Sequence, residues 1–189
     1  VVAAGTTAWP GRFGPVQDEA AETLTLETLA VRNTIAASSV LIRRSSLDQT
    51  GLFDRRLKGP EDYDLWLRTA ERAPVAALRT PLVGYRTVPG SLGQRPASME
   101  CGLRRVLRKL ERRGALRGRW LVRRKASSYV SYSCAYLYRA SGNPRAALTR
   151  LVKSILQYPL PYRRVEVRMP LARARLLASL LLSAAKGAA

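Results

Sequence analysis

The segment EDYDLWLR, Glu61–Arg68, carries the strongest structural signal in the chain and directly follows Gly59–Pro60. Its apolar residues follow the helical spacing i, i+3, i+4 and i+7, and they are Tyr63, Trp66, Leu67 and Ala70. This spacing predicts a helix over residues 61–72 with one apolar face, and Pro74 predicts its end.

The acids that open this helix allow two interpretations. Carboxylates at Glu61 and Asp62 suit the unpaired N–H groups and positive dipole of a helix start, where acids commonly occur without any function. An ionised carboxylate on a rigid helix start beside a Gly-Pro loop is also what a general base for a hydroxyl group requires. Asp64 and Arg68 are four residues apart and are expected to pair, with Trp66 on the other face.

The flanking sequence predicts further strands, helices and loops. Strands are expected at residues 1–7, 75–78 and 82–86, the last two separated by Pro81, and a buried strand is expected within residues 36–44. Helices are expected at residues 18–30, 99–112, 116–138, 146–156 and 171–185, and a short helix or turn ending near Gly51 is expected at residues 47–53. Loops are expected at residues 9–16 and 89–91.

Charge divides the chain into two parts. Residues 1–72 hold 9 basic and 10 acidic residues, whereas residues 73–189 hold 24 basic and 3 acidic residues. The net charge of +20 therefore comes from the second part. We expect two domains with different partners, at residues 1–97 and 98–189.

Several residue types are absent or isolated, which excludes some site chemistries. The chain has no histidine, so Ser-His-Asp and Cys-His nucleophilic sites and histidine-ligated zinc are excluded. Cys101 and Cys134 lack CxxC spacing, so reduced and inert thiols are expected. No signal-peptide pattern follows Val1, and two arginines interrupt the apolar run at 171–185. A first residue other than Met fits a processed or truncated chain.

Six blocks in the first half resemble successive motifs of family 2 glycosyltransferases, which are inverting sugar transferases with a GT-A fold. In order they are Asn33, SSVLIRR (38–44), GLFD (51–54), EDYDLWLR (61–68), PLVGYR (81–86) and PGSL (89–92). The order and spacing of the blocks are similar to those of the family. EDYDLWLR is highly specific, whereas the Tyr85–Arg86 block alone is weak.

The resemblance implies a reaction in which an acceptor hydroxyl attacks the anomeric carbon of a nucleotide-activated sugar, with inversion. It implies Asp62 as the catalytic base and Glu61 as the second catalytic residue, which orients the acceptor or the base. The residues expected in substrate binding are Asp64, Trp66, Arg68 and Arg86. Within this set, Arg68 is expected to bind Asp64, and Arg86 either to lie near the donor diphosphate or to form a structural ion pair.

The resemblance also implies a divalent cation, Mg²⁺ or Mn²⁺, bound by a DxD-type motif in an N-terminal nucleotide-binding half. No such half is recognisable in this chain. Asp62–Asp64 has DxD spacing but occupies the place of the acceptor-side motif, so no metal ligand is assigned. We therefore expect the metal ligands outside this chain, and little transferase activity from the chain alone.

The basic second part allows several interpretations. Residues 102–125 hold 11 basic residues and one acid, with Trp120 among them. This run is either a solvated arginine-rich face or a surface for anionic lipid head groups, helped by an amphipathic helix at 171–185. Nucleic-acid binding is the least favoured interpretation, because no known motif accompanies the charge. Residues 136–159 resemble one tetratricopeptide-type hairpin, and a single helical hairpin is favoured over a repeat array.

The sequence thus predicts an α/β chain: the acceptor-side half of a GT-A glycosyltransferase domain, followed by a basic helical domain. The expected partners are a nucleotide-sugar donor and a saccharide or lipid-linked hydroxyl acceptor, in cell-surface polysaccharide or glycolipid synthesis. The expected location is the cytoplasm, with peripheral contact at the inner face of the cell membrane. The alternative is a non-catalytic helical adaptor that binds partners or anionic membrane surfaces.

Overall fold

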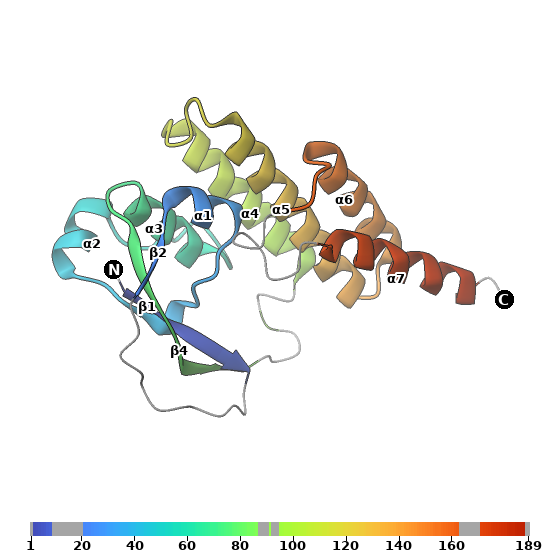
Figure 1. Cartoon of the computed structure of the whole chain (residues 1–189), viewed down its shortest axis with the longest axis horizontal. Coiled ribbons are helices and arrows are strands. Elements are labelled where there is room, and N and C mark those ends of the chain that lie inside the picture. Colours follow the sequence, from blue (N-terminus) through green and yellow to red (C-terminus); the bar gives the residue numbers. More distant parts are fainter. Residues whose placement is uncertain (1, 9–20, 87–90, 92–94, 163–170, 188–189) are drawn as a thin grey trace.

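A computed structural model of the chain describes residues 2–8, 21–86, 91, 95–162 and 171–187. In this part the chain is mixed α/β, as predicted, with a four-stranded mixed sheet followed by a run of long helices (Figure 1). The strands are β1 (Val2–Ala8), β2 (Glu22–Leu24), β3 (Val40–Leu41) and β4 (Val75–Tyr85). The helices are α1 (Leu26–Val31), the 3-10 turn η1 (Ala37–Ser39), α2 (Arg44–Thr50), α3 (Glu61–Ala70), α4 (Pro96–Arg112), α5 (Trp120–Ala140), α6 (Pro144–Gln157) and α7 (Ala172–Gly187).

The sheet has the strand order β2-β4-β1-β3, with β1 parallel to β4 and the two outer strands antiparallel to their neighbours. The two strands expected around Pro81 are one continuous strand, β4. Pro81 is accommodated because the register shifts beside it: Ala3 pairs with Ala77, but Gly5 pairs with Pro81. The extra β4 residues interrupt the regular hydrogen-bond ladder at this point, so Pro81, which has no backbone N–H, does not have to donate to it.

Two predicted elements at the sheet edges are wrong. The helix expected at 18–30 begins only at Leu26, because Thr25 adopts an extended conformation and its hydroxyl accepts a hydrogen bond from Thr28 N at 3.2 Å. Glu22–Leu24 before it is an edge strand, and residues 18–20 lie outside the described part. The buried strand expected within 36–44 is the short edge strand β3, in which Leu41 is 77% exposed.

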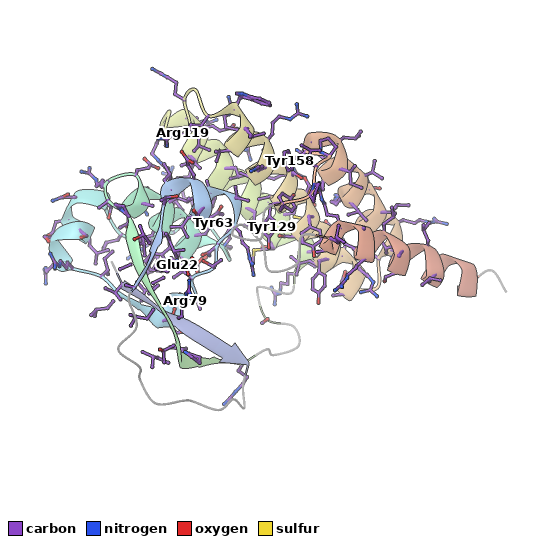
Figure 2. The ribbon with its side chains drawn as sticks, in the orientation of Figure 1. Glu22, Tyr63, Arg79, Arg119, Tyr129 and Tyr158 are labelled. Carbon is purple, nitrogen blue, oxygen red and sulfur yellow. The ribbon has the colours of Figure 1, made fainter. Side chains whose placement is uncertain are left out.

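The core of the α/β part is built around α3. Leu65 and Leu67 are buried with Val75 at the start of β4. The hydroxyl of Tyr63 lies 2.9 Å from the carbonyl oxygens of both Leu29 and Ala30, which joins α3 to α1, and Figure 2 shows Tyr63 in the interior of this part. The predicted apolar face of α3 is therefore confirmed.

The same core extends past the domain boundary expected at residue 97. Val106 and Leu110 of α4, and Leu116 after it, are buried in one cluster with the α3 residues. Helix α5 contacts both α1 and α4, so the helical region lies directly against the α/β part (Figure 1). The helix α4 thus belongs to the hydrophobic core of the first part although its surface charge belongs to the second.

Helices α5 and α6 form an antiparallel hairpin, as predicted from the Gly142–Pro144 break. Gly142 adopts a positive φ of 79°, and the Asn143 side chain caps α6 by accepting from Ala146 N at 3.0 Å. Ala135 and Ala147 are buried where the two helices meet, in one cluster with α7 residues. Whether the hairpin belongs to the tetratricopeptide type stays a prediction. None of the described helices is both long and apolar enough to cross a membrane.

Candidate functional site

The start of α3 is fixed by its own acids and by α4. The side chain of Glu61 accepts a hydrogen bond from Gly59 N at 2.7 Å, and that of Asp62 accepts one from Tyr63 N at 2.6 Å. Pro60 is buried against Gly102 of α4, where a Cβ atom would lie only 2.6 Å from the proline ring. The loop before α3 is therefore held close to α4, and both acids lie on a rigid backbone.

Asp62 has an unusual acidity. Burial raises the pKa of its carboxyl from 3.8 to about 6, the negative charge of Glu61 adds to the rise, and the hydrogen bond from Tyr63 N opposes it. A carboxylate with a pKa in this range is a better proton acceptor than an ordinary aspartate and is still mostly ionised at neutral pH. This combination is what a general base for a hydroxyl group needs.

A cluster of charges lies behind the helix start, and we call it the Asp64 cluster: Asp54, Asp64, Arg68, Lys109 and Arg113. Asp64 is fully buried, and its Oδ2 accepts hydrogen bonds from Arg68 Nε at 3.0 Å and from Lys109 Nζ at 2.8 Å. Lys109 also binds Asp54 at 2.8 Å, and Arg113 lies 3.7 Å from the other oxygen of Asp64. The cluster joins α3 to α4 and to the loop between α2 and α3.

Arg68 extends this cluster to the end of α2. Its Nη2 donates to the Leu52 carbonyl oxygen at 2.8 Å, and its Nη1 donates to the carbonyl oxygen of Thr50. The Asp64–Arg68 pairing predicted from the four-residue spacing is confirmed. Because Arg68 is bound to a carboxylate and to backbone carbonyls, its contacts favour a positioning role over contact with a substrate.

Trp66, predicted in substrate binding, lies in the interior. It is 2% exposed, and the ring of Phe53 contacts it edge-on, with ring centroids 6.4 Å apart. Its buried position, like that of Asp64, favours a role in fixing the helix. Arg86 is exposed directly after β4 and borders residues 87–90, which lie outside the described part. Its relation to Asp62 stays a prediction.

Lys109 and Arg113 belong to this site but were not predicted from the sequence. Both belong to the arginine-rich run, which carried no signal distinguishing a solvated cation from one that reaches a buried acid. The helical spacing of α4 could have identified them. Val106 and Leu110 face the core. Lys109 follows Val106 by three residues and Arg113 follows Leu110 by three residues, so both cations lie on the adjacent face of the helix. Those positions are directed toward α3 and its acids.

The geometry of the site argues against a metal ion at the Asp62–Asp64 pair. Asp64 is already surrounded by three cationic side chains, which would repel a divalent cation. Among the residues that the structure describes, no group of three or more metal-binding side chains comes together. The cations around Asp64 therefore disfavour a metal ion at this pair of aspartates.

Comparisons with protein-family models, with curated proteins and with solved structures found no match for this chain.

Proposed function

We propose that the chain is the acceptor-side part of an inverting glycosyltransferase of family 2 with a GT-A fold, and that Asp62 is its catalytic base. The observation that carries this proposal is the carboxyl of Asp62, partly buried on a rigid helix start with its pKa raised to about 6. The motif EDYDLWLR supplies the resemblance. The mixed α/β sheet is compatible with it at the level of fold class.

In the proposed reaction the ionised Asp62 carboxylate takes the proton of the acceptor hydroxyl as that oxygen attacks the anomeric carbon of the donor sugar. The new glycosidic bond forms while the bond to the nucleoside diphosphate breaks, and the configuration inverts. Glu61 keeps the Gly59 backbone in place, and the Asp64 cluster keeps α3 against α4. Arg86 is proposed near the departing diphosphate, whose negative charge a guanidinium stabilises.

Under this proposal the nucleotide and a divalent cation, Mg²⁺ or Mn²⁺, bind to a segment encoded before Val1. The cation would neutralise the diphosphate, and its ligands are proposed outside this chain. The acceptor is proposed to be a saccharide or a lipid-linked hydroxyl compound of cell-surface polysaccharide or glycolipid synthesis, which would place the enzyme at the cytoplasmic face of the membrane.

The test is nucleotide release from a panel of nucleotide sugars with Mg²⁺ or Mn²⁺. Three proteins are compared: this chain, the chain joined to the coding sequence immediately upstream, and the joined protein with Asp62→Asn. We expect turnover only from the joined protein and a loss of about 100-fold or more with Asp62→Asn, at unchanged donor binding. Activity should rise with pH through about 6, as Asp62 ionises. Absence of turnover from a folded joined protein with every donor would contradict the proposal.

One observation favours a second function, contact with an anionic surface. A groove of about 400 Å³ between α4, α5 and the end of α6 is lined by Trp120, Arg123 and Arg124, together with Glu111, Ser127 and Gln157. Trp120 is 64% exposed, and Arg123 binds Glu111 at 3.3 Å. Cationic side chains beside an exposed indole are typical of membrane-interface contacts. Under this alternative the chain is a helical adaptor, it sediments with phosphatidylglycerol vesicles, and Asp62→Asn leaves that binding unchanged.

A further inference from the structure

A cavity of about 340 Å³ lies between the loop that precedes α3 and the first turns of α4. Its volume is in the range of small-molecule sites in proteins. The loop and α4 contribute its lining residues, which are Arg56, Leu57, Lys58, Ser98, Cys101, Gly102 and Arg105. The cavity is separate from the arginine-rich groove beside Trp120 described above.

The lining of this cavity is cationic and contains no acid. Two neighbouring cations are paired: Arg104 binds Glu100 at 2.7 Å, and Arg113, directly after α4, binds Glu71 at 2.6 Å. Within the described residues, no ion pair involves Arg56, Lys58 or Arg105. Asp54 interacts electrostatically with Arg56, but its carboxylate is already bound to Lys109. Three exposed cations therefore line one cavity without a direct ion pair among the described residues.

The walls of the cavity are held in place before any ligand binds. Arg105 Nη1 donates to the Arg56 carbonyl oxygen at 2.8 Å, so this guanidinium bridges α4 and the loop. Close packing of Pro60 on Gly102 keeps the same two elements together. The start of α4 adds positive potential, because its first turn contains no acid and its N-cap residue makes no side-chain cap. A site with fixed walls loses little free energy in ordering itself around a ligand.

We propose that this cavity binds the phosphate or diphosphate group of a small anionic ligand. The guanidinium groups of Arg56 and Arg105 and the ammonium group of Lys58 form charge-assisted hydrogen bonds to the phosphate oxygens. The Ser98 hydroxyl lies in the same lining and can donate another. The proposal goes beyond sugar transfer and stands without it, because it does not use Asp62.

Cys101 provides a direct measurement of occupancy. Its thiol is exposed and lines the cavity, whereas Cys134 is buried and burial raises the pKa of that thiol to about 12. Alkylation by iodoacetamide, which is uncharged, should therefore report Cys101 alone. We expect pyrophosphate to slow this alkylation at least about fivefold at saturation, compared with sodium chloride of equal ionic strength.

Variants assign the effect to the cavity. Lys58→Ala and Arg105→Ala should each raise the half-protecting pyrophosphate concentration about tenfold, the loss expected from one charge-assisted hydrogen bond. Arg112→Ala, an exposed position later on α4, should leave it unchanged. Circular dichroism checks that each variant is folded. The hydrogen bond from Arg105 to the Arg56 carbonyl joins α4 to the loop, and Lys58 takes no part in it. Lys58→Ala therefore tests the site even where Arg105→Ala loosens the structure.

The same assay distinguishes two sources of the phosphate. Protection by soluble pyrophosphate supports a soluble ligand, whereas protection only by phosphatidic acid vesicles, and not by phosphatidylcholine vesicles, supports a phosphate on a lipid. The proposal is overturned if neither protects Cys101 beyond the salt control, or if protection is equal in the parent chain, Lys58→Ala and Arg105→Ala.

Discussion

The two halves of the molecule bury charge in opposite ways. In the α/β part, the fully buried carboxylate of Asp64 is bound by Arg68 and Lys109. In the helical part, Arg173 of α7 is 6% exposed and is bound by neutral groups, among them the carbonyl oxygens of Tyr158 and Leu160. Its guanidinium also lies over the ring of Tyr162, 4.6 Å from the centroid.

The difference follows from what each element supplies. The start of α3 is rich in acids, and α4 carries the cations that reach them. The end of α6 offers backbone carbonyls with no helical partner and the negative end of a helix dipole, and these stabilise a cation without an acid among the described residues around it. Within the described residues, the two halves therefore stabilise a buried charge with different groups: cations around Asp64 and carbonyl oxygens around Arg173.

The largest effect is expected from Asp64. Asp64→Asn removes the fully buried charge that binds two partly buried cations, and breaking a buried ion pair in this way typically costs about 3–5 kcal/mol. We therefore expect the free energy of unfolding to fall by about 3 kcal/mol or more, measured by urea denaturation with circular dichroism. Asp48→Asn on the exposed face of α2 is the matched control and should change it by less than about 0.5 kcal/mol.

A compensating variant sharpens this prediction. Replacing Asp64, Arg68 and Lys109 together by leucine, leucine and methionine should recover part of the loss, because the buried carboxylate and both of its cations are removed together. Asp54 loses Lys109 in this variant, but its carboxylate is partly exposed to water. A loss below about 1 kcal/mol for Asp64→Asn would show that the cluster is not a structural centre and would remove its proposed role in fixing Asp62.

Arg173 is expected to have the next largest effect. Arg173→Met removes the donor that the carbonyl oxygens of Tyr158 and Leu160 share, and each buried unsatisfied acceptor costs about 1–3 kcal/mol. Removal of a buried charge offsets part of this cost, so we expect a net loss of about 2 kcal/mol. The loss should be smaller for Arg173→Lys, since a single ammonium cannot span both Tyr158 and Leu160.

The exposed Arg145 of α6 provides the control, and Arg145→Met should be nearly silent. A neutral or stabilising Arg173→Met would mean that the carbonyls find other donors. In that case Asp64→Asn and Arg173→Met would differ in stability only because they remove different numbers of hydrogen bonds.

Asp62 differs from both Asp64 and Arg173. Its carboxylate is partly buried, and no cation among the described residues changes its pKa. Its pKa is raised, so between pH 3.8 and about 6 the folded chain binds more protons than the unfolded chain, and stability falls as pH rises through this range. Asp62→Asn should therefore stabilise the chain by about 1–2 kcal/mol at pH 7.5. At pH 3 the gain should disappear. Thermal unfolding at the two pH values measures the difference, and an equal gain at both would contradict the raised pKa.

The comparison also shows which features a sequence can predict. Helix α3, its apolar face and the Asp64–Arg68 pair were predictable, because they depend on residues three or four positions apart. The contact of Lys109 with Asp64 joins residues 45 positions apart, and no local pattern encodes it. The same limit applies to Pro81, which usually interrupts a strand and is accommodated here by a register shift against Gly5 of β1. The positions of Asp62 and Glu61 on α3 were predicted, but the environment that changes the pKa of Asp62 is tertiary.

The smallest effect on stability is expected from Asp54, the partly exposed acid of the Asp64 cluster. Asp54→Asn tests whether the cluster depends on this acid. The hydrogen bond from Lys109 lowers the pKa of Asp54 below its ordinary value of 3.8, so its contribution to stability is present above that pH and is lost as pH falls through the lowered pKa. Asp54 is partly exposed, and water screens the pair. We expect Asp54→Asn to cost less than about 1 kcal/mol at pH 7, and we expect this cost to shrink as pH falls through the lowered pKa. The same measurement on Arg173→Met should show no such decline toward pH 2, because no carboxylate is described among its partners. A parallel pH profile for the two variants would mean that Arg173 is also coupled to an acid, and the distinction between the two halves would fail.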